Sequence, residues 1–233
     1  MLELTRLEFS YGAEKFQFDL TVSRGEIVAL IGPSGAGKST LLLLVGGFLQ
    51  ASGGSILLDG RDITGLGPER RPVSTIFQEH NLFPHLTAYQ NVAIGVDPGL
   101  RLNDEQRARV EAAMQRTYLG GLQQRLPGAL SGGQRQRISI ARVLARQQPV
   151  LLLDEALTGL GPSLRTELLA LINELVAAES MSAIMVSHHP EDALKVCPRI
   201  AFMQNGSIDS VVSAEQLASG EVNPSLAEYL GHD

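Results

Sequence analysis

The sequence predicts an α/β protein in which helices cover a mainly parallel sheet, with a β-rich N-terminal part and a helical insertion in the middle. Three observations lead to this fold class. The first 60 residues alternate apolar and polar side chains, as half-buried strands do. From about residue 80 to residue 128 the pattern becomes helical. After that, apolar strands alternate with helices, an order typical of parallel sheets.

The N-terminal part is expected to contain strands and one helix. Residues 2–12 and 15–22 have the period of half-buried strands. Residues 26–32 form a nearly continuous apolar run that ends in glycine, as expected for a strand buried on both faces. A helix is predicted from Lys38 to Val45. A further strand is predicted within residues 53–63, where glycines mark a turn on each side.

The rest of the chain is predicted to be one continuous domain. Asn103 and Gln106 form a capping pair, so a charged helix is expected to begin there. No internal repeat and no proline-rich or serine-rich linker divides residues 1–233, which favours a single domain. The remaining expected elements are a helix over 132–146, a strand over 150–153, a helix over 164–178 and a strand over 183–186.

Composition narrows the class of protein. The formal net charge is −6, from 19 basic and 25 acidic side chains, which disfavours nonspecific binding to nucleic acids. The single cysteine, Cys197, cannot form an internal disulfide, so a reducing cytoplasm is the expected compartment. The charged N-terminus does not resemble a signal peptide, and the longest apolar segment, Leu41–Leu49, has about half of the ~20 residues that span a bilayer. With 5 histidines and no cysteine cluster, no zinc site is expected.

A glycine-rich loop between the strand at 26–32 and the following helix matches the pattern G-x-x-x-x-G-K-[ST]. Glycines let the backbone direct its N–H groups at phosphate oxygens, and a helix N-terminus favours anions. Lys38 supplies a charge for the β- and γ-phosphates, and the Ser39 hydroxyl can bind Mg²⁺. A chance glycine-rich turn is the alternative, and the strand–loop–helix context argues against it. The expected nucleotide-binding residues are Gly32, Pro33, Ser34, Gly35, Ala36, Gly37, Lys38, Ser39 and Thr40.

A pair of acidic residues ends the apolar strand at 150–153. Asp154, leaving a buried strand, can hold the Mg²⁺ shell, while Glu155 can orient or deprotonate water. Such a pair alone is a weak signal, because apolar strands often end in acids. Together with the glycine-rich loop it indicates hydrolysis of a nucleotide.

The segment Leu130–Arg137, LSGGQRQR, narrows the class further. Its serine and glycines are predicted to open a helix, although a merely flexible helix start would have the same residues. With this segment the chain resembles the ATP-binding subunits of ABC transporters, whose signature is LSGGQ. The resemblance implies a P-loop NTPase core of the ABC-ATPase type and a head-to-tail dimer around two ATP molecules. In that dimer the signature of one copy caps the phosphate loop of the other, through Ser131, Gly132, Gly133 and Gln134.

The resemblance also implies roles for three residues outside these motifs. Tyr11 corresponds to the aromatic residue that stacks on adenine, although without the resemblance ordinary edge-strand packing is the better interpretation. Gln78 corresponds to the glutamine that reaches Mg²⁺ and the attacking water. His188 corresponds to the histidine that contacts the γ-phosphate, and with Lys38 and Glu155 it completes the expected catalytic set.

The family organisation implies subdomains and partners. Residues 1–79 and 149–233 are expected to form a RecA-like core with an N-terminal antiparallel β-subdomain, and residues 80–148 a helical subdomain. A separate transmembrane permease is expected to dock near residues 78–89, including Phe83 and Leu86, and a periplasmic solute-binding protein to act indirectly. The chain is then expected to lie peripherally at the cytoplasmic face of the bacterial inner membrane and to bind no nucleic acid.

Two segments, residues 70–92 and 97–106, are most similar to the ATPase subunits of bacterial importers of thiamine and thiamine pyrophosphate. An importer ATPase for another small solute, such as a metal, sulfate or a polyamine, remains an alternative. A soluble ABC ATPase acting on DNA or ribosomes is disfavoured by the single nucleotide-binding unit, the missing coiled-coil arm and the acidic charge. The signature and His188 disfavour a simple P-loop kinase.

One position departs from the family pattern. Gly161 stands where these proteins usually have an aspartate that helps to connect the two active sites of the dimer. Together with Gly159 it also adds backbone freedom to the loop. We therefore expect weaker coupling between the two sites, with ATP binding intact; a subunit that hydrolyses ATP poorly, or compensation by neighbouring groups, are the alternatives.

Overall fold

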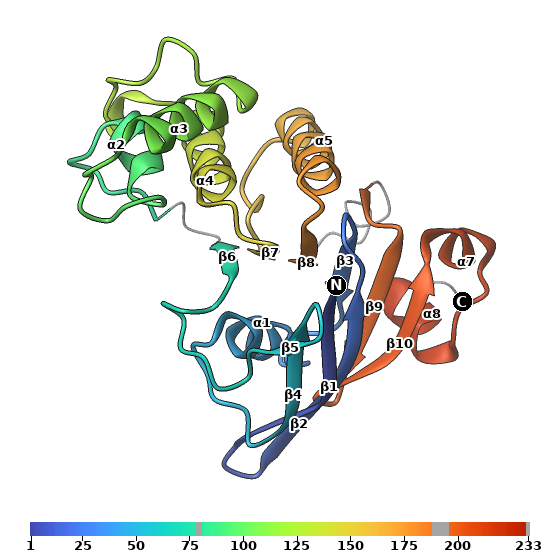
Figure 1. The fold of residues 1–233 in the computed structure, drawn as a ribbon. Coiled ribbons are helices and arrows are strands. Elements are labelled where there is room, and N and C mark those ends of the chain that lie inside the picture. The colour runs from blue at the N-terminus through green and yellow to red at the C-terminus, as the bar shows by residue number, and fades with distance from the viewer. Residues whose placement is uncertain (78–80, 188–195, 232–233) are drawn as a thin grey trace.

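The computed structural model describes residues 1–77, 81–187 and 196–231. Ten strands from these residues form one sheet in the order β5-β4-β1-β2-β10-β9-β3-β8-β7-β6, with helices packed around it (Figure 1). The predicted α/β class is therefore confirmed. In the described part of the chain, no helix has both the length and the apolar character that crossing a membrane requires.

Five neighbouring strands form the parallel half of the sheet. Every residue of β3 and β8 is buried, which explains their continuously apolar sequences. Because these strands run in the same direction, the loops that follow them meet at one edge of the sheet. In spatial order they are β6 (Val73–Ile76), β7 (Val150–Asp154), β8 (Ser182–Val186), β3 (Ile27–Ile31) and β9 (Arg199–Gln204).

The other half of the sheet is largely antiparallel, as expected for the N-terminal part. Strand β1 pairs in this way with β2 and β4, and β4 with β5, while β10 joins the two halves by pairing with β9 and β2. The bounds are β1 (Leu2–Tyr11), β2 (Glu14–Val22), β4 (Gly53–Leu58), β5 (Arg61–Asp62) and β10 (Ser207–Ser213).

Two apolar cores lie on opposite faces of the parallel strands. The alternation along β3 separates them: Val28 and Leu30 pack with α1 and the N-terminal strands, whereas Ile27 and Ala29 belong to the core that contains α4 and α5. Around this half lie α1 (Lys38–Gly46), α5 (Pro162–Ala178), α7 (Ala214–Ser219) and α8 (Pro224–Leu230).

The predicted helical insertion is present as a group of helices at one side of the molecule (Figure 1). The predicted capping pair of Asn103 and Gln106 opens α3, with hydrogen bonds in both directions. The boundary of this helical lobe with the core stays a prediction. The lobe contains α2 (Ala88–Ala93), α3 (Asp104–Arg116), the short 3-10 helix η1 (Pro127–Ala129) and α4 (Gly132–Arg146).

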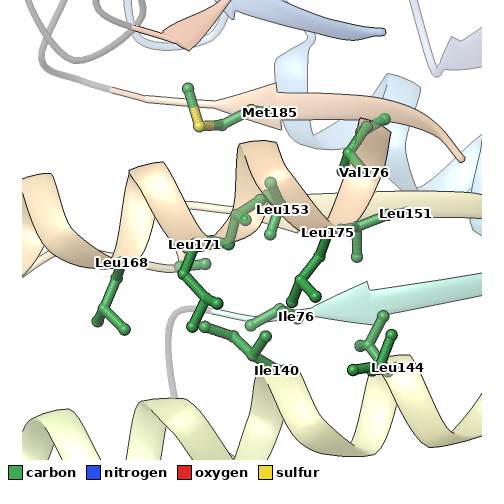
Figure 2. Packing of buried hydrophobic residues seen from close by; sticks show 14 of the residues in the cluster. Ile76, Ile140, Leu144, Leu151, Leu153, Leu168, Leu171, Leu175, Val176 and Met185 are labelled. Carbon is green, nitrogen blue, oxygen red and sulfur yellow. The ribbon is translucent and has the colours of Figure 1, made fainter. Parts of the chain in front are cut away.

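Helix α4 packs against α5 as well as against the other helices of its own lobe. Ile140 and Leu144 of α4 point toward α5, and Leu151 of β7 belongs to the same cluster (Figure 2). An ion pair between Arg137 of α4 and Glu167 of α5, at 2.5 Å, adds a polar link. Movement of α4 is therefore constrained by its contact with α5.

Candidate active site

The glycine-rich loop leaves β3 and enters α1 in a conformation that depends on glycine. Gly32 and Gly37 have φ values of 144° and 100°, which disfavour residues with a side chain. A Cβ at Gly32 would lie 2.1 Å from the backbone oxygen of Met203 in β9, and one at Gly37 would lie 2.8 Å from the ring of Phe16. The loop thus packs closely against Met203 and Phe16, and these contacts restrict its conformation.

Lys38, the first residue of α1, folds back over this loop. Its ammonium group donates hydrogen bonds to the carbonyl oxygens of Gly32, at 2.7 Å, and Pro33, at 2.8 Å. The residue is only 6% exposed, and this burial lowers the pKa of Lys38, while the negative charge of Glu155 acts in the opposite direction. A positive charge is therefore held at the mouth of the loop by neutral oxygens.

An open pocket of about 660 Å³, including the space continuous with solvent, surrounds this lysine. Tyr11, at the end of β1, stands edge-on to Phe9 and Phe16 with centroid distances of 4.7 and 6.0 Å. The tyrosine remains 47% exposed, so its ring is accessible to a ligand. The pocket is lined by Tyr11, Glu14, Phe16, Ser34, Gly35, Gly37, Lys38, Ser39, Thr40 and Glu155.

The acidic pair reaches the same edge of the sheet from β7. Asp154 ends the strand, half-buried and paired with Val186 of β8. Glu155 follows with φ of 48°, an uncommon value for a residue with a side chain, and its backbone N–H donates to the Val186 oxygen at 3.3 Å. This sharp change of direction places Glu155 in the wall of the pocket that contains Lys38.

The signature residues lie elsewhere. Ser131 caps α4: its hydroxyl accepts from the Gln134 N–H at 3.2 Å, and the Gln134 side chain accepts from the Ser131 N–H at 3.0 Å. Gly132 follows at the first position of the helix, and Gly133 lies so close to α5 that a Cβ would be 2.7 Å from a methyl carbon of Leu164. None of these residues lines the pocket around Lys38, and α4 lies far from α1 (Figure 1).

Two predicted site residues, Gln78 and His188, lie outside the described residues. The strands that lead to them are described: β6 ends at Ile76 and β8 at Val186, on either side of β7. Both strands pair in parallel with β7, so the described ends of the three strands lie at the same edge of the sheet.

One contact of the glycine-rich loop has no local signal in the sequence. The hydroxyl of Tyr229, in α8, donates to the Gly32 carbonyl oxygen at 3.2 Å, and its ring packs on Phe202 of β9 at a centroid distance of 5.3 Å. The contact joins residues 197 positions apart, so no local pattern could reveal it.

The glycine-rich loop between β3 and α1, together with the acidic end of β7, defines a P-loop nucleoside triphosphatase fold. The chain belongs to the ABC transporter family: the family described as "ABC transporter" matches residues 16–158. The Chelativorans sp. (strain BNC1) protein "Thiamine import ATP-binding protein ThiQ" is 50% identical over 99% of this chain and 94% of its own length. The Escherichia coli (strain K12) protein of the same description is 47% identical, covering 97% of both chains.

Solved structures agree with this assignment. An ATP-binding cassette of an ABC transporter in its ADP conformation superposes with a TM-score of 0.88 at 25% identity, over 99% of this chain and 98% of that chain. A bacterial ABC transporter cassette described as dimeric gives a TM-score of 0.77 at 27% identity, over 92% of this chain and 99% of that chain.

Proposed function

We propose that this chain is the ATP-hydrolysing subunit of a bacterial ABC importer that takes up thiamine and its phosphates through a separate permease. The observation that carries the proposal is the pocket in which Lys38 and Glu155 converge beside a P-loop. Thiamine as the solute rests on relatives described as thiamine import ATP-binding proteins, which match this chain along nearly its whole length.

ATP would occupy the pocket with its adenine against the exposed ring of Tyr11 and its phosphates inside the loop of residues 32–40. The backbone N–H groups of the loop and the N-terminus of α1 favour the negative phosphates. Lys38 would exchange one or both carbonyl contacts for the β- and γ-phosphates, because hydrogen bonds to charged phosphate oxygens are stronger than those to the neutral oxygens of Gly32 and Pro33.

The donors at this edge of the sheet suit Mg²⁺, which prefers oxygen ligands. Ser39 lines the pocket, Asp154 ends the apolar strand β7, and we assign Gln78 as a further ligand. When bound, Mg²⁺ neutralises phosphate charge. Glu155 would orient or deprotonate the attacking water, and His188 would contact the γ-phosphate.

A second copy of the chain would complete each site. Because Ser131, Gly132, Gly133 and Gln134 lie away from the pocket of their own chain, they are available to cap ATP held by a partner. Closure on ATP and opening after hydrolysis would then supply the mechanical step for a permease. The assembly would lie at the cytoplasmic face of the inner membrane, with a periplasmic solute-binding protein on the opposite side.

The groove proposed for the permease lies on the helical lobe. Phe83 is 45% exposed and lines it together with Leu86, Ile94 and Val96. Removing two apolar contacts by Phe83→Ala with Leu86→Ala should abolish most uptake, because the permease loses its docking surface. ATP binding to the free subunit should persist, because neither residue lines the nucleotide pocket. Unchanged uptake in the double variant would count against this placement.

The experiment that tests the function begins with the dimer. Glu155→Gln should bind ATP without hydrolysing it and form an ATP-dependent dimer on size-exclusion chromatography. The double variant Glu155→Gln with Lys38→Ala should stay monomeric. Without Lys38, the negative phosphates lose the ammonium group that would neutralise them in the pocket, so ATP should bind too weakly to hold a dimer together. A monomer at saturating ATP would contradict the ABC mechanism.

The solute is tested in proteoliposomes that contain the chain, its permease and its solute-binding protein. ATP-dependent uptake of labelled thiamine is expected, with no competition by sulfate, a polyamine or a metal ion. Uptake of one of these competitors in place of thiamine would overturn the solute while leaving the ATPase assignment intact.

A further inference from the structure

The loop that leads into α2 is wrapped around one buried side chain. Asn91, on α2, is fully buried. Its amide nitrogen donates to the carbonyl oxygens of Phe83 at 3.0 Å, Leu86 at 2.9 Å and Thr87 at 3.1 Å. Its amide oxygen accepts from the Phe83 N–H at 2.9 Å. One side chain thus fixes the backbone from Phe83 to Thr87, the segment that presents Phe83 and Leu86 to the groove.

Arg142 of α4 holds that asparagine from the other side. Its guanidinium donates to the Asn91 backbone oxygen at 2.8 Å, to the Asn91 side-chain oxygen at 3.0 Å and to the Asn81 backbone oxygen at 3.1 Å. These hydrogen-bond partners are neutral, and burial lowers the pKa of Arg142 to about 10, so it remains charged at neutral pH. The planar guanidinium suits three such acceptors, which a lysine ammonium cannot reproduce.

The packing leaves little freedom between this arginine and α2. A Cβ at Gly95, just beyond α2, would lie 2.7 Å from the Arg142 Cγ. Arg142 also lines the groove that contains Phe83 and Leu86, so the same side chain touches both the loop and the proposed docking surface.

The position of Arg142 on α4 connects these contacts to the signature at the start of the same helix. The helix begins at the signature, where Ser131 is its N-cap, and Arg142 lies eleven residues later, about 16 Å along the axis. One helix therefore carries the residues proposed to cap a partner's ATP and the residue that holds the docking loop. A displacement of the signature moves Arg142 with it, because an α-helix transmits movement along its axis as a nearly rigid body.

We propose that Arg142 is a positioning residue which, through Asn91, makes the permease-docking loop follow the movement of the signature helix. The inference rests on the proposed function of the chain as an importer ATPase. Without the hydrogen bonds from Arg142 to Asn91, α4 could still move toward a partner's ATP. The loop that contains Phe83 and Leu86 would then keep its position. ATP hydrolysis and transport would then be separated.

The test uses the complete transporter in proteoliposomes and compares wild type with Arg142→Met, Arg142→Lys and Arg109→Met. Arg109, on α3, is the matched control, because it also donates to a backbone oxygen of this lobe, that of Ala145, at 2.6 Å, but does not line the groove. The measured quantity is the ATPase rate stimulated by thiamine-loaded binding protein, divided by the unstimulated rate, together with thiamine uptake.

In Arg142→Met the ratio and the uptake should both fall by about tenfold, a usual size for coupling between two sites. Arg142→Lys should lose a smaller part of both, because an ammonium can reach only some of the three oxygens. Arg109→Met should keep the wild-type ratio. A merely structural role of Arg142 would lower stimulated and unstimulated rates together and leave the ratio unchanged.

A wild-type ratio in Arg142→Met, or an equal loss in Arg109→Met, would overturn the inference. If Arg142→Met does not fold, the test uses Arg142→Lys instead. A wild-type ratio of stimulated to unstimulated ATPase rate in Arg142→Lys would then overturn the inference. A wild-type transporter that takes up no thiamine would refute the proposed solute instead, and the ratio can then be measured with whichever solute stimulates it.

Discussion

At the scale of single residues, the glycine-rich loop is shaped by its neighbours as much as by its own sequence. Gly32 combines a φ of 144° with a backbone oxygen of β9 only 2.1 Å from the position of a Cβ. The motif itself requires a glycine for the approach of phosphate. The structure adds a second reason, because the backbone of β9 leaves no room for a methyl group there.

Gly32→Ala should therefore lower the free energy of unfolding by at least ~3 kcal/mol, from backbone strain and overpacking together. ATP affinity should fall as well, because the loop must move to relieve the clash. The matched control is Gly121→Ala, at φ of 77° but with open space around its Cβ, which should cost only about 1 kcal/mol. Equal losses in urea denaturation of the two variants would contradict the steric argument.

Cys197, the only cysteine, is a second residue whose behaviour follows from burial. It is 2% exposed, and desolvation raises the pKa of its thiol to about 12. The native protein should resist iodoacetamide at pH 8 and react in urea, as mass spectrometry can measure. Since the folded pKa lies above the unfolded value of about 8.5, the thiol's contribution to stability is complete below that pH and is lost as pH rises toward 12. Fast alkylation of the native protein would contradict this placement.

At the scale of elements, α1 is held at both ends. Its N-terminus begins at Lys38, and its C-terminus is closed by Arg71, which is 2% exposed. The guanidinium donates to the oxygens of Leu44 at 3.1 Å and Val45 at 3.0 Å. It also donates to the oxygens of Leu66 and Thr64 in the loop before β6, at 2.8 and 2.6 Å. A buried arginine thus replaces the donors that the last turn of α1 lacks.

Arg71→Met should leave several buried carbonyl oxygens without donors and destabilise the protein by about 3 kcal/mol. Because α1 carries Lys38 and Ser39, ATP affinity should fall too. Arg70→Met is the control, since its side chain is 75% exposed and its only ion pair is with neighbouring Glu69 in the described part of the chain. Thermal unfolding and nucleotide titration of both variants measure the difference; a similar small shift in both would refute the capping role.

Helix α8 is connected to the glycine-rich loop by the hydroxyl of Tyr229. Tyr229→Phe removes this one hydrogen bond and keeps the ring against Phe202. Unfolding free energy should fall by about 1 kcal/mol, and ATP affinity should weaken by a few-fold, because the Gly32 oxygen loses one of the two side-chain donors that it has among the described residues. Tyr118→Phe, at a side chain that is 70% exposed, should change neither. A Tyr229→Phe variant with wild-type affinity would show that α8 does not influence the loop.

Some elements with a strong local signal were predicted well, and others that have such a signal were missed. The helix at 132–146 begins and ends as expected, because Ser131 caps it and its apolar face repeats regularly. The predicted helix at 164–178 begins two residues earlier, at Pro162, since proline suits the first turn of a helix. Strand β6 is short and has little local signal, whereas helix α2 was missed although Thr87 and Gln90 form a capping box at its start.

At the scale of the whole molecule, the structure brings some of the residues predicted for the site into one pocket and leaves others apart. The loop, Tyr11 and Glu155 meet in one pocket, whereas the signature lies on α4 in the helical lobe. Long-range contacts such as those of Tyr229 and Arg71 depend on the completed fold and have no local motif. Because the signature and the pocket are separate in one chain, the site would be completed by a second copy under the proposed function.

The loop after Glu155 offers the sharpest test of that dependence. Gly161 is the N-cap of α5 without a side-chain hydrogen bond, and space around its Cβ is open. Gly161→Asp should cap α5 and stabilise the free subunit by about 0.5 kcal/mol. Gly161→Asn should cap it similarly but brings no charge. In the dimer only the carboxylate would restore the proposed connection between sites, so only Gly161→Asp should raise the rate and cooperativity of transport-coupled ATP hydrolysis. Wild-type values for Gly161→Asp, or equal gains for Gly161→Asn, would show that coupling between the sites is not limited by this glycine.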